Sequence, residues 1–202
     1  MEGLYFYWIT WLGWIYTTFF MDKGKKRLIL SFLILLILSL SSIDLLINTY
    51  HLNLVHLIIL ILPFALIVKK TIAQKVYLLI CSLTITIAYV TFQLFELFDP
   101  IWLFLDRKWM LAIVLVYLTL MLTKERVSRI ACLLIGSCQG ELLYGFIINK
   151  FRFNYEIGSY SFLDVLSLSF IIVFVWLKLE VLIQYIDEMV QKNAKGETRI
   201  NE

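Results

Sequence analysis

The chain has 202 residues, of which 61% are hydrophobic and 16% are charged, and its mean hydropathy is +0.87. Soluble domains are about 45–50% apolar and about 25% charged, so this composition excludes an ordinary soluble domain and favours a protein embedded in a lipid bilayer. The net charge of +3 comes from residues at the ends of hydrophobic stretches rather than from one basic patch, which argues against nucleic acid as a partner.

Hydrophobic stretches follow one another along the chain, separated by short polar gaps. A spanning helix needs about 20 mostly apolar residues, and these stretches are too long for strands. The sequence therefore predicts an all-α, polytopic membrane protein, a bundle of seven transmembrane helices. The expected spans are residues 3–21, 28–47, 52–68, 76–95, 101–122, 130–148 and 162–183. Residues 1–190 would form a single transmembrane domain, and residues 191–202 are polar and predict a short disordered cytoplasmic tail.

Lys and Arg fall in alternate gaps between these stretches. Seven spans place thirteen of them on one side and four on the other, with Lys178 inside the last span. Positive residues stay on the cytoplasmic side, so we expect the N-terminus outside, the C-terminus in the cytoplasm and the chain in the cell membrane. The fifth span is the weakest, because its uncharged run is only fourteen residues long. If it did not cross, the split would be nine against eight; Asp99 and Pro100 are also suited to begin a helix there.

The sixth stretch carries the strongest candidate for a polar site. It holds three of the eight glycines and one acid, and at 100° per residue these fall on one half of the helix: Gly136, Gly140, Gly145 and Glu141. Gln139 is out of phase with this polar face. A glycine face lets another helix approach closely, and Glu141 would then bond across the contact. The alternative is that Glu141 is a proton or cation site, since an ionisable residue in a membrane is costly.

Three further acids are expected toward the outer half of the membrane, namely Asp44, Glu96 and Asp164. With Glu141 and Gln139, Asp44 and Asp164 make a candidate intramembrane polar site. The alternative is that these acids lie at the interface and pair with basic residues there, such as Arg107, Lys150 or Arg152.

No catalytic or metal-binding motif is evident. The sequence lacks Gly-x-Ser-x-Gly, His-Glu-x-x-His and a P-loop, so we expect no enzyme activity and no cofactor. His51 and His56 are five residues apart, about 140° on a helix, which does not suit a metal pair. His56 is instead expected to make a polar contact within the bundle.

The first and last stretches carry surfaces for other molecules. Tyr7, Trp11 and Trp14 follow one face of the first helix, which suits anchoring in the bilayer, packing or a partner helix. The expected partners are therefore the lipid bilayer and other membrane proteins, reached through the first and sixth helices. The last helix continues an apolar stripe beyond the membrane, through Leu182, Tyr185, Ile186 and Met189.

The N-terminal residues resemble a known family. Residues 1–8 (Met-Glu-Gly-Leu-Tyr-Phe-Tyr-Trp), the aromatic run ending in Phe19-Phe20-Met21 and the basic residues 23–27 look like the start of the YphA-type family. These are small multi-pass membrane proteins of Bacillus-like endospore formers, and the resemblance implies a cytoplasmic-membrane protein with a role in spore envelope assembly. Two functions stay open: a non-enzymatic scaffold or partner-binding protein, and a small transporter or proton-coupled permease that uses Glu141.

Overall fold

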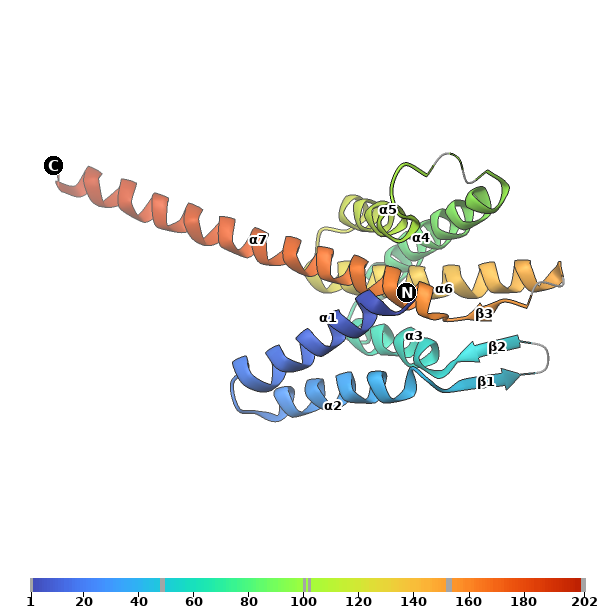
Figure 1. Ribbon diagram of the computed structural model, residues 1–202. Coiled ribbons are helices and arrows are strands. Elements are labelled where there is room, and N and C mark those ends of the chain that lie inside the picture. The colour runs from blue at the N-terminus through green and yellow to red at the C-terminus, as the bar shows by residue number, and fades with distance from the viewer. Residues whose placement is uncertain (1, 48–49, 100, 102, 152–153, 201–202) are drawn as a thin grey trace.

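The computed structural model describes residues 2–47, 50–99, 101, 103–151 and 154–200. In these residues the chain folds into seven α-helices, one π-helical turn and three short strands (Figure 1). The helices are α1 (Leu4–Ile15), continued by the π-helical η1 (Tyr16–Phe20), α2 (Lys25–Leu40), α3 (Leu54–Ile67), α4 (Ile72–Phe98), α5 (Arg107–Leu122), α6 (Arg126–Lys150) and α7 (Tyr160–Ile200). The strands are β1 (Asp44–Ile47), β2 (Tyr50–Asn53) and β3 (Glu156–Ile157).

Helix α6 lies at the centre of the bundle and packs against α3, α4, α5 and α7. Its side chains are buried on nearly every face, as Leu133, Cys138 and Ile148 show. Protein therefore surrounds most of this helix, and its buried polar side chains must find their partners within the bundle. The most extensive helix contact is between α4 and α6, where Ile85 and Tyr89 are fully buried.

Contacts at the helix ends show that the helices alternate in direction. At one end, the start of α7 meets the starts of α1 and α5, and Gln93 late in α4 contacts Arg107 at the start of α5. At the other end, the Tyr77 hydroxyl early in α4 donates to the Leu122 carbonyl at the end of α5, 2.5 Å away. Helices α1, α5 and α7 therefore run in one direction and α4 runs in the opposite direction, as expected for a chain that crosses a bilayer repeatedly.

Three helices are long and apolar enough to cross a membrane by length and composition: Ile72–Phe98, Arg126–Lys150 and Tyr160–Gln191. The remaining helices are shorter, with 16 residues in α2, 14 in α3 and 16 in α5. The described residues therefore form a helical bundle with several membrane-crossing candidates, and the count of seven spans stays a prediction.

The fifth helix starts later than the sequence suggested. It begins at Arg107 rather than near residue 101, and Asp106 is its N-cap, with the Lys108 N–H donating to Oδ1 at 3.0 Å. Asp99 instead follows the end of α4 and accepts from the Ile101 N–H, and Pro100 lies outside the described residues. Two Asp residues compete for one helix start, and propensity alone does not rank them.

The three strands were not predicted, and they shorten the second span. Helix α2 ends at Leu40, so Asp44 lies in β1 and not in a helix. Strands β1 and β2 pair antiparallel with Asp44 opposite Asn53, and β2 pairs parallel with β3. Strands of four residues inside an apolar run leave no clear alternation to detect, and the partner β3 comes a hundred residues later.

The last helix continues through Ile200, where the sequence predicted a disordered tail from residue 191. Six of the twelve tail residues are Glu, Lys, Gln or Ala, which are strong helix formers, and the tail extends a helix that is already nucleated in the bundle. In Figure 1 this end of α7 runs away from the other helices toward the C-terminus.

Candidate functional site

The four predicted site residues lie in three separate places rather than in one site. Glu141 is in the centre of α6, and Gln139 on the same helix accepts a bond from the Thr86 hydroxyl of α4 at 3.4 Å. Asp164 is in the first turns of α7. Asp44 is exposed on β1, where the Asn53 amide donates to Oδ1 at 3.0 Å.

Glu141 is completely buried, and both of its carboxylate oxygens accept hydrogen bonds. The Tyr89 hydroxyl of α4 donates to Oε2 at 2.6 Å, and the Tyr155 hydroxyl donates to Oε1 at 2.8 Å. The Gly158 N–H, in the turn before α7, donates to the same Oε1 at 3.1 Å. Burial raises the pKa of the Tyr155 phenol, so this group stays a donor at ordinary pH. One carboxylate thus ties α6 to α4 and to the connection that leads into α7.

A series of hydrogen bonds runs from this carboxylate to the end of the bundle. The Gln93 amide donates to the Tyr89 hydroxyl at 3.0 Å, and Arg107 Nη2 donates to Gln93 Oε1 at 2.5 Å. Arg107 also pairs with Glu96, with 2.9 Å between Nε and Oε2. The Glu96 side chain is 18% exposed, so the series connects a fully buried acid with one at the edge of the bundle.

The glycines of α6 allow the close approach on which these bonds depend. A Cβ at Gly136 would lie 2.7 Å from Ile85 Cβ, and one at Gly140 would lie 2.8 Å from Tyr89 Cβ and its ring. At Gly145 it would lie 2.5 Å from Ile157 Cγ1. Helix α4 therefore rests directly on the α6 backbone, and this contact brings Tyr89 to Glu141.

Gly140→Ala tests this approach. The added methyl group is expected to lower the free energy of unfolding by about 1–3 kcal/mol. The Tyr89 ring cannot move away from it, because this side chain is fully buried and its hydroxyl is hydrogen-bonded to Glu141 and Gln93. The measurement is thermal unfolding of the purified protein in detergent. Gly13→Ala is the matched control, since its Cβ would lie 3.9 Å from the nearest atom, Ile34 Cδ1. Equal effects at the two positions would contradict the close packing.

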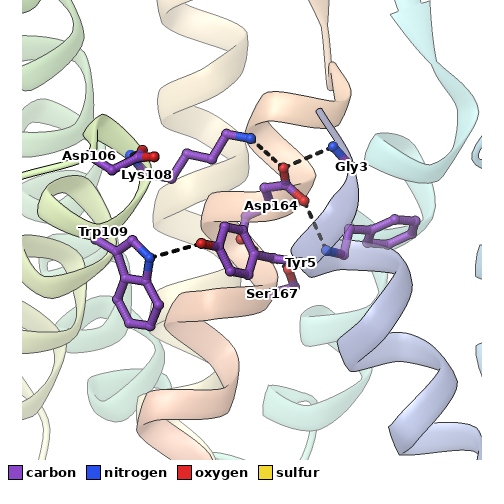
Figure 2. Close-up of polar contacts among 8 residues, drawn as sticks. Gly3, Tyr5, Asp106, Lys108, Trp109, Asp164 and Ser167 are labelled. Carbon is purple, nitrogen blue, oxygen red and sulfur yellow. Dashed lines mark hydrogen bonds and ion pairs between the residues drawn. The ribbon is translucent and has the colours of Figure 1, made fainter. Parts of the chain in front are cut away.

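Asp164 is also completely buried and joins three helices at the other polar centre (Figure 2). Its Oδ2 accepts from the Gly3 N–H at 2.9 Å and from Lys108 Nζ at 2.6 Å, and its Oδ1 accepts from the Phe6 N–H at 2.9 Å. The first N–H groups of a helix have no partner within the helix. An acid of α7 thus caps α1 and pairs with a base of α5.

Tyr5 and Trp109 strengthen the same junction of α1 with α5. The Trp109 indole N–H donates to the Tyr5 hydroxyl at 3.1 Å, and the two rings meet edge to face with centroids 5.9 Å apart (Figure 2). The aromatic residues at the start of α1 are therefore partly packed in the protein and are not all free to contact lipid.

His56 differs from its expected role. It is fully buried, and its ring packs against Phe162 with centroids 5.2 Å apart. Among the described residues neither ring nitrogen has a hydrogen-bond partner. The side chain contributes packing beside the turn at Gly158, whose φ of 81° is left-handed and suits glycine.

A third group of polar contacts lies at the opposite end of the bundle and holds α7 there. The nearly buried Arg129 pairs with Glu180, with 2.6 Å between Nη1 and Oε1, and its Nε donates to the Thr123 carbonyl at 2.8 Å. The Arg126 guanidinium donates to Gln184 at 2.7 Å. Beside them Glu125 pairs with Lys70, whose ammonium lowers the pKa of that carboxyl. Arg126 and Arg129 are among the thirteen basic residues predicted on one side, but their contacts with α7 were not predicted.

These helices agree with what the comparisons with known proteins found. A family model described as YphA-like integral membrane protein matches residues 2–199. The chain belongs to this family. It is 30% identical to the "Uncharacterized protein YphA" of Bacillus subtilis (strain 168) over 203 residues, covering 100% of each chain. No solved structure matches it.

Membership of the YphA-like family confirms the resemblance drawn from the first residues, and it makes the chain an integral membrane protein. The match spans the segments that hold both polar centres and nearly all of the long last helix. The name of this relative assigns it no activity.

Proposed function

We propose that the chain is a non-enzymatic scaffold or partner-binding protein of the membrane. The observation that carries this proposal is the use of the two buried acids. Both oxygens of Glu141 and both oxygens of Asp164 accept hydrogen bonds from the chain's own groups. An intramembrane acid is by default a candidate for transport or catalysis, but these two join helices to one another. Together they support α1, α4, α5, α6 and α7 as one rigid unit.

The proposed topology has seven crossings, with the N-terminus outside and the C-terminus in the cytoplasm. The alternating helix directions support it, as does the gathering of Lys70, Arg126 and Arg129 at one end of the bundle. The helices of 14 and 16 residues are about 21–24 Å long, shorter than the hydrocarbon layer. A bilayer accommodates such helices by thinning locally.

Labelling with a membrane-impermeant maleimide tests the topology. We expect Lys150→Cys to react in intact cells and Lys124→Cys to react only after the membrane is opened. The native Cys81, Cys132 and Cys138 are at most 2% exposed and serve as a silent background. Labelling of both new cysteines from the same side would contradict the seven crossings.

A second function, a proton-coupled permease that uses Glu141, is favoured by one observation. The bonds through Tyr89, Gln93 and Arg107 lead from the buried acid toward Glu96 at the bundle edge. Proton relays in pumps and transporters use ionisable Asp, Glu and His side chains, and Glu141 and Glu96 are the two acids at the ends of this series.

Glu141→Gln separates the two functions. It keeps the shape of the side chain and an acceptor for Tyr155 and Gly158 but removes the ionisable proton. A scaffold keeps its function with this change, and a permease loses it. The measurement is complementation of a deletion strain, in growing and in sporulating cells, with the protein level in the membrane measured alongside. We expect complementation by Glu141→Gln and a defect of the deletion strain in assembling the spore envelope.

A further inference from the structure

We propose that the partner of α7 is a second copy of this chain, and that the two α7 helices form a parallel coiled coil that starts in the membrane and continues beyond it. This proposal rests on the proposed scaffold function and names one of its partners. It is carried by the length of α7, by the spacing of its exposed apolar side chains and by the direction that the membrane imposes on two copies.

Helix α7 is much longer than one crossing requires. Its 41 residues extend about 61 Å, roughly twice the thickness of the hydrocarbon layer. The contacts of Glu180 and Gln184 with Arg129 and Arg126 mark where it leaves the bundle. Residues 181–190 are all exposed, and Figure 1 shows this part of the helix projecting away from the other helices.

Apolar side chains are exposed on several faces of α7, among them Val181, Ile183 and Val190. Five others repeat with alternating spacings of four and three. Each is about half exposed, at 47–53%, and they are Val175, Leu179, Leu182, Ile186 and Met189. This spacing is the a/d repeat of a two-stranded coiled coil, and Asn193 occupies the next a position in the sequence. A single Asn at an a position favours two parallel strands in one register. The polar Gln184, Asp187 and Gln191 lie on the opposite side of the helix.

The direction of α7 excludes the bilayer surface as the cover for this stripe. The helix is unbroken from the bundle to Ile200, and Figure 1 shows its end running away from the other helices. In the proposed topology this direction carries it out of the bilayer on the cytoplasmic side. In the proposed topology Ile186 and Met189 lie beyond the expected span and therefore in water, where a continuous exposed apolar surface is covered by protein. Two copies in one membrane insert the same way round, so their α7 helices are parallel and leave the bilayer at the same height, as a coiled coil through residues 175–189 requires.

Cysteine cross-linking of the full-length protein in native membranes tests the proposal. Leu182→Cys, Ile186→Cys and Met189→Cys are each oxidised with copper phenanthroline and run on a non-reducing gel. We expect a shift from 23.8 kDa to twice that mass. Gln191→Cys is the matched control, since Gln191 is also exposed and lies two residues from Met189 but faces away from the stripe. Adding Ile186→Glu should abolish the cross-link at Leu182→Cys, and normal labelling of the membrane-embedded bundle would show that the chain still folds.

Two results would overturn the pairing of α7 helices. One is the absence of a dimer at all three stripe positions, and the other is equal cross-linking at Met189→Cys and Gln191→Cys, which reports random collision. Either result leaves the scaffold function standing with a different partner on α7, whereas failure of Glu141→Gln to complement would overturn the scaffold function and leave the dimer untouched.

Discussion

Asp164→Ala is expected to lower the free energy of unfolding by about 3–5 kcal/mol, the cost of removing one member of a buried ion pair. The change takes away the acceptor for the Gly3 and Phe6 N–H groups and the buried counter-charge of Lys108. Helix α1 then loses its cap and α5 loses its ionic link to α7. The measurement is denaturant unfolding in detergent micelles.

A local readout distinguishes this mechanism from general damage. The amide of Phe6 should exchange with solvent much faster in Asp164→Ala, while amides in the centre of α6 keep their protection until global unfolding. The control is Asp106→Ala, which removes an exposed N-cap of α5 and should cost only about 0.5–2 kcal/mol. If the two variants unfolded alike, Asp164 would not be the residue that holds α1 in place.

How much of this arrangement the sequence predicts depends on the range of the interaction. The helical class and the glycine face of α6 follow from local pattern, since hydropathy and 100° spacing are properties of one segment. The junction of Asp164 with α1 and α5 does not follow, because it joins Gly3 and Lys108 to a residue more than fifty positions away. Such groups meet only when the whole chain folds, and no pattern within one segment predicts which of them will pair.

The fourth stretch carries a local signal for one partner of Glu141. Its polar residues follow a repeat of four and three, so they line one face of α4: Ser82, Thr86, Tyr89, Gln93 and Glu96. A polar stripe on one apolar helix matches the polar half of another, and Thr86 and Tyr89 indeed contact α6. Matching these two faces would have predicted Tyr89 as the partner of Glu141. Tyr155 and Gly158 lie in a connection with no such periodicity.

Glu141→Leu is expected to destabilise the bundle more than any change on its surface. A leucine fills the space but leaves three donors without their acceptor, namely the Tyr89 and Tyr155 hydroxyls and the Gly158 N–H. Each buried donor that finds no new partner costs about 1–3 kcal/mol. Because Tyr155 and Gly158 precede α7, the start of that helix should loosen with the α4–α6 contact. Thermal unfolding in detergent and protease cleavage between α6 and α7 measure the two effects.

Glu141→Gln is the control that isolates the hydrogen bonds from the charge. The amide oxygen can still accept from Tyr155 and Gly158, and only the Tyr89 hydroxyl loses its acceptor. We therefore expect a loss of about 1–3 kcal/mol, well below that of Glu141→Leu. Combining Glu141→Leu with Tyr155→Phe should cost less than the sum of the single changes, because the second change removes one of the stranded donors. If Glu141→Gln were as unstable as Glu141→Leu, the charge of Glu141 rather than its hydrogen bonds would stabilise the bundle. If both variants were as stable as the native chain, the carboxylate would not be needed for helix packing. It would then be free for transport, and the scaffold function would lose its main support.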